Sequence, residues 1–164
     1  IAYPTESCYG LGCDPFLYKA IMKINTLKNK IKNKNFIIIG SELTQFNKLI
    51  KNMNTNEKKR LHTKWPGAHT WLVEANKKTP KWLTSSNKIA LRIPSFIHCI
   101  RITQAINQPV ISTSLNKSGK KPIKSYRDAC RLFNGKVKII NGQIGRNRKP
   151  SSIHDFSTGK IYRN

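Results

Sequence analysis

The segment Pro109–Gly119 combines an apolar, strand-like start with a run of hydroxyl and amide side chains. Val110 and Ile111 are typical of a buried strand, and the chain continues as Ser112-Thr113-Ser114-Leu115-Asn116-Lys117-Ser118-Gly119. Ligands of open α/β sheets bind at the carboxyl ends of strands. Hydroxyl, amide and backbone N–H groups can hold phosphate oxygens there. Because the same residue types are common in turns, the segment is either a phosphate-binding loop or an ordinary turn.

Two basic features could supply the positive charge that a phosphate or carboxylate needs. Lys28 and Lys30 lie in a lysine-rich loop after an expected helix. There they either neutralise a bound anion or complement the negative end of the helix. Arg92 lies inside the alternating segment Ile89–Ile93. Since an Arg on a strand is rarely buried without an anionic partner, Arg92 either meets such a partner or faces solvent at a sheet edge.

Several standard catalytic sites are absent from the sequence. There is no P-loop, and Gly10-Leu11-Gly12 is followed by Pro15 where a dinucleotide fingerprint has its third glycine. The chain has only seven Asp and Glu, which argues against a paired-carboxylate glycosidase and against an acid-rich two-metal site. The four histidines show no ligand-like grouping. We therefore expect no metal held by protein side chains, and we assign no catalytic base.

The charge of the chain is strongly unbalanced. Thirty-one Lys and Arg against seven acids give a formal net charge of +24. Such a charge favours a polyanionic or nucleotide partner. Lys, Asn and Ile are abundant together, however, as an AT-rich genome would produce, so many of the lysines can equally be solvated surface. The charge indicates an anionic partner, with RNA or tRNA among the possibilities, and does not name one.

The four cysteines, Cys8, Cys13, Cys99 and Cys130, form no C-x-x-C pair. Free thiols in a chain long enough for a core point to a reducing, cytosolic setting. Cys8 and Cys13 are either packing thiols or a redox pair. No apolar run approaches the roughly 20 residues that span a bilayer, so we expect a cytoplasmic protein without a membrane partner.

The elements that must position these residues alternate between strands and helices. Helices are expected to open at Asp14–Pro15, at Ser41, at Thr55, over Phe96–Ile106 and from Ser125 to about Phe133. Strands are expected at Ile1–Tyr3, Phe36–Ile39, His69–Ala75, Ile89–Ile93, Pro109–Thr113, Val137–Ile140, Ser152–Phe156 and Ile161–Arg163. This order predicts an α/β protein with a mixed parallel and antiparallel sheet, in one domain over residues 1–164.

Taken together, several blocks of sequence resemble the threonylcarbamoyl-AMP synthase (TsaC/YrdC) family. The blocks are Ile1–Glu6, Tyr9–Pro15, Trp65-Pro66-Gly67, Ala90-Leu91-Arg92, Ser112–Gly119 and Pro150–Ile153. Each block is weak alone, but their order and spacing cover nearly the whole chain. The resemblance is closest to the short, single-domain bacterial form. It implies a twisted mixed sheet with a basic concave cavity, and an N-terminal helix that would precede Ile1.

The resemblance also implies a reaction. Members of the family join L-threonine, bicarbonate or CO2, and ATP into threonylcarbamoyl-adenylate and release pyrophosphate. Proteins of a transfer complex then carry the threonylcarbamoyl group to adenosine 37 of tRNAs that read ANN codons. A threonine carbamate is a weak nucleophile, so catalysis should rest on its orientation toward the α-phosphate. Cationic groups and Mg2+ would offset the charge on the phosphoryl oxygens.

Site residues are implied by position in the matching blocks. Thr5, Arg92 and Ser112 match threonine contacts of the family, with Arg92 the partner of the carboxylate. The ATP contacts are matched by Lys28, Lys30, Ser114 and Asn116.

The chain departs from the family pattern at three positions near this site. Lys30 replaces an Arg, Ile31 replaces a Pro, and Leu115 replaces an Ala. Lys keeps the charge but loses the planar fork of Arg, and Leu115 is bulky for a tight turn. We therefore predict weaker ATP binding than in a typical member.

Two other functional hypotheses compete with that of a synthase. A basic RNA-binding module on the same fold would explain the charge, although the sequence has no aromatic base-stacking motif. A phosphosugar enzyme of the dihydroxybutanone-phosphate synthase type shares the fold but needs an acid-lined metal site.

Overall fold

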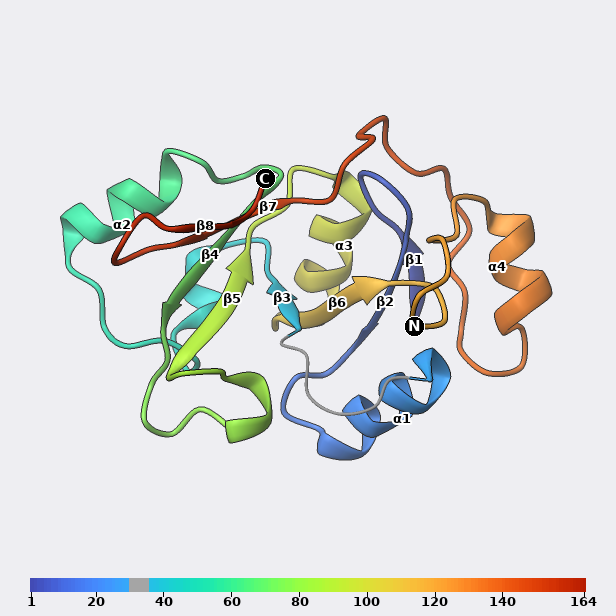
Figure 1. Ribbon diagram of the computed structural model, residues 1–164, viewed down its shortest axis with the longest axis horizontal. Coiled ribbons are helices and arrows are strands. Elements are labelled where there is room, and N and C mark those ends of the chain that lie inside the picture. Colours follow the sequence, from blue (N-terminus) through green and yellow to red (C-terminus); the bar gives the residue numbers. More distant parts are fainter. Residues whose placement is uncertain (30–35) are drawn as a thin grey trace.

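The computed structural model describes residues 1–29 and 36–164. Within them, one eight-stranded sheet has the strand order β1-β2-β6-β3-β5-β4-β7-β8 (Figure 1). The strands are β1 (Ala2–Pro4), β2 (Tyr9–Cys13), β3 (Ile37–Ile39), β4 (His69–Glu74), β5 (Lys88–Arg92), β6 (Val110–Ser114), β7 (Ser152–Asp155) and β8 (Ile161–Arg163). The pairs β3–β5 and β4–β7 are parallel, and the other neighbours are antiparallel. The expected mixed α/β sheet is confirmed.

The helices flank this sheet. They are α1 (Tyr18–Lys28), α2 (Thr55–His62), α3 (Ile97–Ala105) and α4 (Tyr126–Phe133), with short 3-10 turns at Leu43–Phe46 and Lys81–Leu83. Helices α1 and α4 lie toward the β1–β2 end of the molecule, and α2 lies toward the β4–β7–β8 end (Figure 1). Among the described residues, no helix is long and apolar enough to cross a bilayer.

The alternation of side chains along the central strands separates a core face from a site face. Ile38 pairs with both Leu91 and Ile111, and all three side chains enter the main apolar core. The residues one position away, such as Arg92 and Ser112, point to the opposite face because successive side chains of a strand alternate.

Part of the site face is covered by α3. Cys99 of this helix packs with Tyr3, Ile39 and Val110 in a second, smaller apolar cluster. This packing fills one end of the face with apolar side chains. Polar side chains on the neighbouring part of the same face can therefore form a cavity.

Strand β2 is not among the strands predicted from the sequence. Glycine is uncommon in strands, and β2 contains both Gly10 and Gly12. Each glycine permits a close approach: a Cβ on Gly12 would lie 2.6 Å from the carbonyl oxygen of Ile111, and a Cβ on Gly10 would lie 2.9 Å from Cγ2 of Thr5. The two glycines lower the strand propensity of this segment, and the close packing around the strand requires them.

Two predicted elements differ in type from those in the structure. The helix expected from Ser41 is only a 3-10 turn at Leu43–Phe46, and its start is held by the side chain of Gln45, which accepts a hydrogen bond from the Ser41 N–H at 2.9 Å. The strand expected at Val137–Ile140 is reduced to an isolated bridge between Ile139 and Ala2. Its potential partner β1 ends at a proline, which has no N–H to extend a ladder.

The observed helix starts match the predicted positions only in part. Ser125 caps α4 as expected, accepting a hydrogen bond from the Asp128 N–H. The cap of α2 is Asn54, one residue before the expected Thr55, and it forms a capping box with Glu57. The first helix begins at Tyr18, because the Asp14 carboxylate accepts from the Phe16 N–H at 2.8 Å and so forms a tight turn ahead of the helix.

Candidate functional site

A pocket of about 240 Å3 opens on the site face of the sheet. It is lined by residues of the loop after β1, the end of β5, strand β6 and the two C-terminal strands; they include Thr5, Ser7, Cys8, Arg92, Ser112, Ser114, Ser151 and Arg163. The sheet brings together residues that lie far apart in the sequence. Three predicted threonine contacts, Thr5, Arg92 and Ser112, therefore share one cavity with the predicted ATP contact Ser114.

Arg92 is partly buried and has an anionic partner, which is one of the two possibilities left open by its place in a strand. Its Nη2 donates to the Glu6 carboxylate, and its Nε donates to the carbonyl oxygen of Gly67 at 2.8 Å. Both side chains of the ion pair are 12% exposed. The partner is thus a side chain of the protein itself, and no local sequence pattern points to it.

The hydroxyls of Thr5 and Ser112 are oriented by neighbouring groups. Thr5 Oγ1 donates to the carbonyl oxygen of Cys8 at 2.8 Å, so its oxygen can accept from a ligand. Ser112 Oγ accepts from the buried phenol of Tyr3 at 2.8 Å, which leaves its own hydrogen available for donation. The pocket therefore presents both an acceptor and a donor.

Lys28 organises the loop that follows β6. Its ammonium donates to the carbonyl oxygen of Ser114, to that of Asn116 at 3.0 Å and to Asn116 Oδ1 at 2.8 Å. Ser114 Oγ also donates to Asn116 Oδ1, at 2.7 Å. Lys28 is only 5% exposed. The structure thus brings together three of the four predicted ATP contacts.

The fourth predicted ATP contact, Lys30, lies outside the described residues, as does Ile31. Leu115 is fully buried in the main core, and its N–H donates to the Tyr9 carbonyl oxygen at 2.8 Å. Its side chain therefore points away from the pocket. The bulk of Leu115 gives no steric reason for weak ATP binding, and that prediction depends on Lys30 alone.

Ser151 and Arg163 are pocket residues that the sequence analysis did not assign. Arg163 donates through Nε to the Ser151 carbonyl oxygen at 2.8 Å and through Nη2 to Ser151 Oγ at 3.1 Å. The block Pro150–Ile153 could have pointed to Ser151. Arg163 carried no local signal, because only the pairing of β8 with β7 brings it to the pocket.

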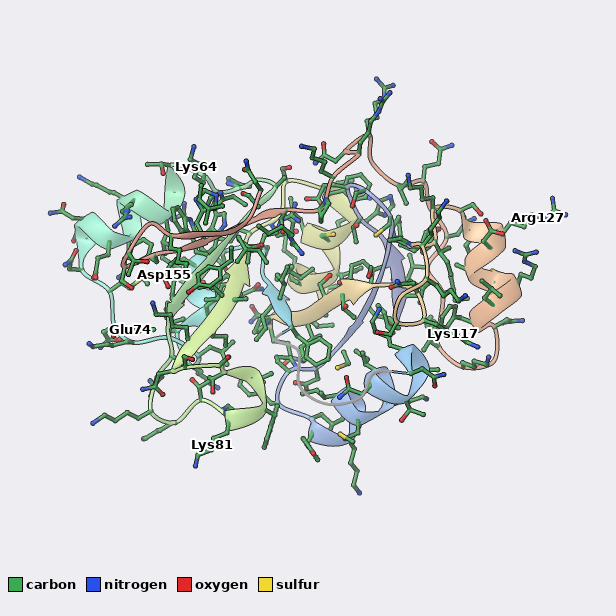
Figure 2. All side chains as sticks on the ribbon, in the orientation of Figure 1. Lys64, Glu74, Lys81, Lys117, Arg127 and Asp155 are labelled. Carbon is green, nitrogen blue, oxygen red and sulfur yellow. The ribbon has the colours of Figure 1, made fainter. Side chains whose placement is uncertain are left out.

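A second cavity, of about 630 Å3, adjoins the Asn116 loop. Its walls come from the end of α1, the loop after β6, and α4. Its lining includes five cationic side chains: Lys117, Lys120, Lys121, Arg131 and Lys136. Figure 2 shows Lys117 at the α1–α4 end of the molecule. No acidic side chain is among its described lining residues, although Arg131 pairs with Asp128 at 3.1 Å. The cavity lining therefore carries a net positive charge.

Burial changes the titration of several groups around the first pocket. It raises the pKa of the Cys8 thiol, which keeps that pocket residue protonated at neutral pH. Burial, followed by the charges of His154, Lys64 and Arg92, lowers the pKa of His69 to about 4. Both groups are therefore uncharged at neutral pH, so the positive charge of this pocket comes from its arginines.

The described residues contain no group of three His, Cys, Asp or Glu that could hold a metal ion. Glu6, the acid beside the pocket, is already paired with Arg92. This donor set does not fit a metal held by the protein. It fits Mg2+ only as part of a substrate, because Mg2+ commonly binds through phosphates and water.

The fold and the site define a class: an open, mixed α/β sheet with a small cationic pocket next to a lysine-clamped polar loop. The chain belongs to the Sua5/YciO/YrdC family, whose model, described as "Telomere recombination", matches residues 1–164. The threonylcarbamoyl-AMP synthase of Methylobacillus flagellatus is 39% identical and covers 99% of this chain and 91% of its own. That of Buchnera aphidicola is 36% identical, covering 99% and 95%.

Solved structures agree with this assignment. P. abyssi Sua5 complexed with L-threonine is 26% identical, with a TM-score of 0.84, and the match covers 94% of this chain and 46% of that one. The chain thus spans about half of the Sua5 chain. E. coli YciO has 24% identity and a TM-score of 0.79 over 99% of this chain and 81% of its own, which supports the fold alone.

Proposed function

We propose that this protein is a threonylcarbamoyl-AMP synthase, which forms threonylcarbamoyl-adenylate and pyrophosphate from L-threonine, bicarbonate or CO2, and ATP. The observation that carries the proposal is the shared pocket, in which Thr5, Arg92 and Ser112 lie beside Ser114. Relatives named for this activity match 99% of the chain, which supports the same reading. The proposal includes a single functional domain over residues 1–164.

Threonine would bind at the Arg92 end of the pocket. A guanidinium matches a carboxylate through two parallel hydrogen bonds, and Arg92 keeps N–H groups beyond those given to Glu6 and Gly67. The Thr5 oxygen could accept from the substrate amine, and the Ser112 hydroxyl could donate to an oxygen of the carbamate.

ATP would bind toward the Asn116 loop. Ser114, Asn116 and Lys30 would contact its phosphates directly. Lys28 would act mainly by holding the loop, since its ammonium already donates to three acceptors there. Arg163 adds a second guanidinium to the pocket wall and could stabilise charge on the α-phosphate.

The chemistry would then depend on orientation and charge. The threonine amine combines with CO2 and releases a proton to solvent, or combines with bicarbonate and releases water, to give a carbamate. A carbamate oxygen forms a bond to the α-phosphorus, while the bond to the bridging oxygen of the β-phosphate breaks and its electrons leave with pyrophosphate. Mg2+ would enter with ATP as its phosphate complex. Arg92 and Arg163 would hold the anionic partners together.

The product would serve threonylcarbamoyl transfer to adenosine 37 of tRNAs that read ANN codons, in the cytoplasm and with the proteins of a transfer complex. The basic cavity near Lys117 favours direct contact with RNA, because its five lining cations would attract phosphates. This surface also supports the alternative function, a non-catalytic RNA-binding module on the same fold.

One assay separates the two functions. The protein is incubated with ATP, Mg2+, bicarbonate and labelled threonine, and pyrophosphate and the labelled adenylate are measured. The synthase predicts pyrophosphate release that depends on threonine and that is lost in Arg92→Ala. Salt-sensitive RNA binding without threonine-dependent release would establish the binding module instead.

A further inference from the structure

Glu6 does not line the pocket itself but contacts Arg92, which does. Arg92 is among the pocket-lining residues, and Glu6 is not. The two side chains form a mostly buried ion pair. Because Glu6 accepts from Nη2 and Gly67 accepts from Nε, the lateral edge of the guanidinium is occupied by the protein. The Nη1 group and the second hydrogen of Nη2 remain for a ligand that approaches end-on.

The charge of the pocket depends on this pair. Arg92 and Arg163 both line the cavity, and neither Ser151 nor Gly67, which accept their other hydrogen bonds, carries a charge. Among the described residues, Glu6 is the acidic side chain that forms an ion pair with Arg92. With Glu6 ionised, the Arg92 end is formally neutral, and without it two positive guanidiniums would face one small cavity.

We propose that Glu6 is a specificity-determining residue that makes the Arg92 end select a zwitterionic amino acid over inorganic and nucleotide phosphates. The inference rests on the proposed binding of threonine at Arg92. A neutral ion pair attracts a carboxylate through directed hydrogen bonds, whereas an unpaired guanidinium attracts any anion through its charge. The reaction needs this distinction, because ATP and pyrophosphate occupy the adjoining part of the same site.

A zwitterion and an anion respond differently to the loss of Glu6. Removing one negative charge improves the field for phosphate, but for threonine the gain at the carboxylate is offset at the ammonium. We expect the ratio of phosphate affinity to threonine affinity to rise at least tenfold.

The surrounding backbone lets this be tested by substitution. The Glu6 carbonyl oxygen accepts from the Asn147 N–H at 3.0 Å, and the adjacent Thr5 carbonyl oxygen accepts from the Gly145 N–H at 2.9 Å. These bonds hold the main chain independently of the Glu6 side chain. Glu6→Gln, which keeps the shape and removes the charge, is therefore the informative variant.

The experiment measures threonine binding by calorimetry in Glu6→Gln, with and without inorganic phosphate as the competing probe. Phosphate should compete at least tenfold more strongly than in the wild type, and Glu6→Asp should restore most of the exclusion. Glu74→Gln is the matched control, because Glu74 pairs with Lys51 at an exposed position. An unchanged ratio of affinities in a folded Glu6→Gln would overturn the inference.

Two further measurements keep the outcome clear. In the wild type, 10-fold excess phosphate should leave threonine binding unchanged, and strong competition there would also overturn the inference without any variant. Arg92→Gln tests the underlying function: if it leaves threonine affinity intact, threonine does not bind at Arg92 and the proposed site itself fails. If Arg92→Gln abolishes binding while Glu6→Gln keeps the selectivity, only the role of Glu6 is wrong.

Discussion

Lys28 donates two hydrogen bonds to Asn116, to its side-chain oxygen at 2.8 Å and to its carbonyl oxygen at 3.0 Å. The contact joins the last residue of α1 to the loop after β6, 88 positions further along the chain. Because Lys28 is also nearly buried, its charge has little water around it and depends on these acceptors. The polar loop is therefore shaped by the end of a helix remote in sequence.

Lys28→Ala should destabilise the fold and weaken ATP binding together. Three acceptors lose a charged donor, so we expect a loss of about 2–3 kcal/mol in the free energy of unfolding. ATP affinity should fall about tenfold or more as the loop relaxes. Urea denaturation and calorimetry with ATP measure the two effects. Lys23→Ala, on an exposed position of the same helix, should change neither; normal ATP affinity in Lys28→Ala would contradict the role assigned to the loop.

Lys30→Arg should strengthen ATP binding. A guanidinium can contact two phosphate oxygens at once, whereas an ammonium acts as a point charge. We expect a several-fold lower Kd for ATP by titration calorimetry, with threonine affinity unchanged. If the variant binds ATP no more tightly than the parent, the Lys at this position is not what limits affinity.

Gly10→Ala should damage the threonine end of the pocket. The new Cβ would lie 2.9 Å from Thr5 Cγ2 and 3.3 Å from the Tyr3 ring, so the Thr5 side chain would have to move. Overpacking of this kind costs about 1–3 kcal/mol in stability, and KM for threonine should rise more than KM for ATP. Gly159→Ala, at a turn where a Cβ meets nothing within 4 Å, separates the two effects, since it strains the backbone without touching the pocket. An equal rise in both KM values would refute a specific effect through Thr5.

His69 should make the protein less stable in mild acid. Its pKa is lowered from 6.5 to about 4, first by burial and then by nearby positive charge. Between pH 6.5 and about 4, His69 is protonated in the unfolded state but neutral in the folded state. The free energy of unfolding should therefore fall as pH drops from about 6.5 to 4. The loss should reach about 3 kcal/mol, because one pKa unit corresponds to about 1.4 kcal/mol. Denaturation midpoints across this range should vary less in His69→Gln, and identical pH slopes would show that another group is responsible.

The sequence by itself determined the class of the fold and most of the candidate site. Alternating apolar segments indicated a mixed α/β sheet, and the matching blocks pointed to Thr5, Arg92, Ser112, Ser114 and Asn116, whose side chains or loops the structure brings together. These signals are local, because a strand or a polar loop depends on residues that are neighbours in the chain. The place of Arg92 in a strand left two possibilities, an anionic partner or a solvent-facing sheet edge.

Only the tertiary structure decided which anion Arg92 meets and what surrounds it. Glu6 reaches Arg92 across 86 residues, and Arg163 enters the pocket through the pairing of β8 with β7. Leu115, judged from its place in a polar loop, turned out to be a core residue. Long-range contacts of this kind are set by strand order and register, which local patterns do not encode. The charge balance of the pocket is accordingly a property of the folded sheet.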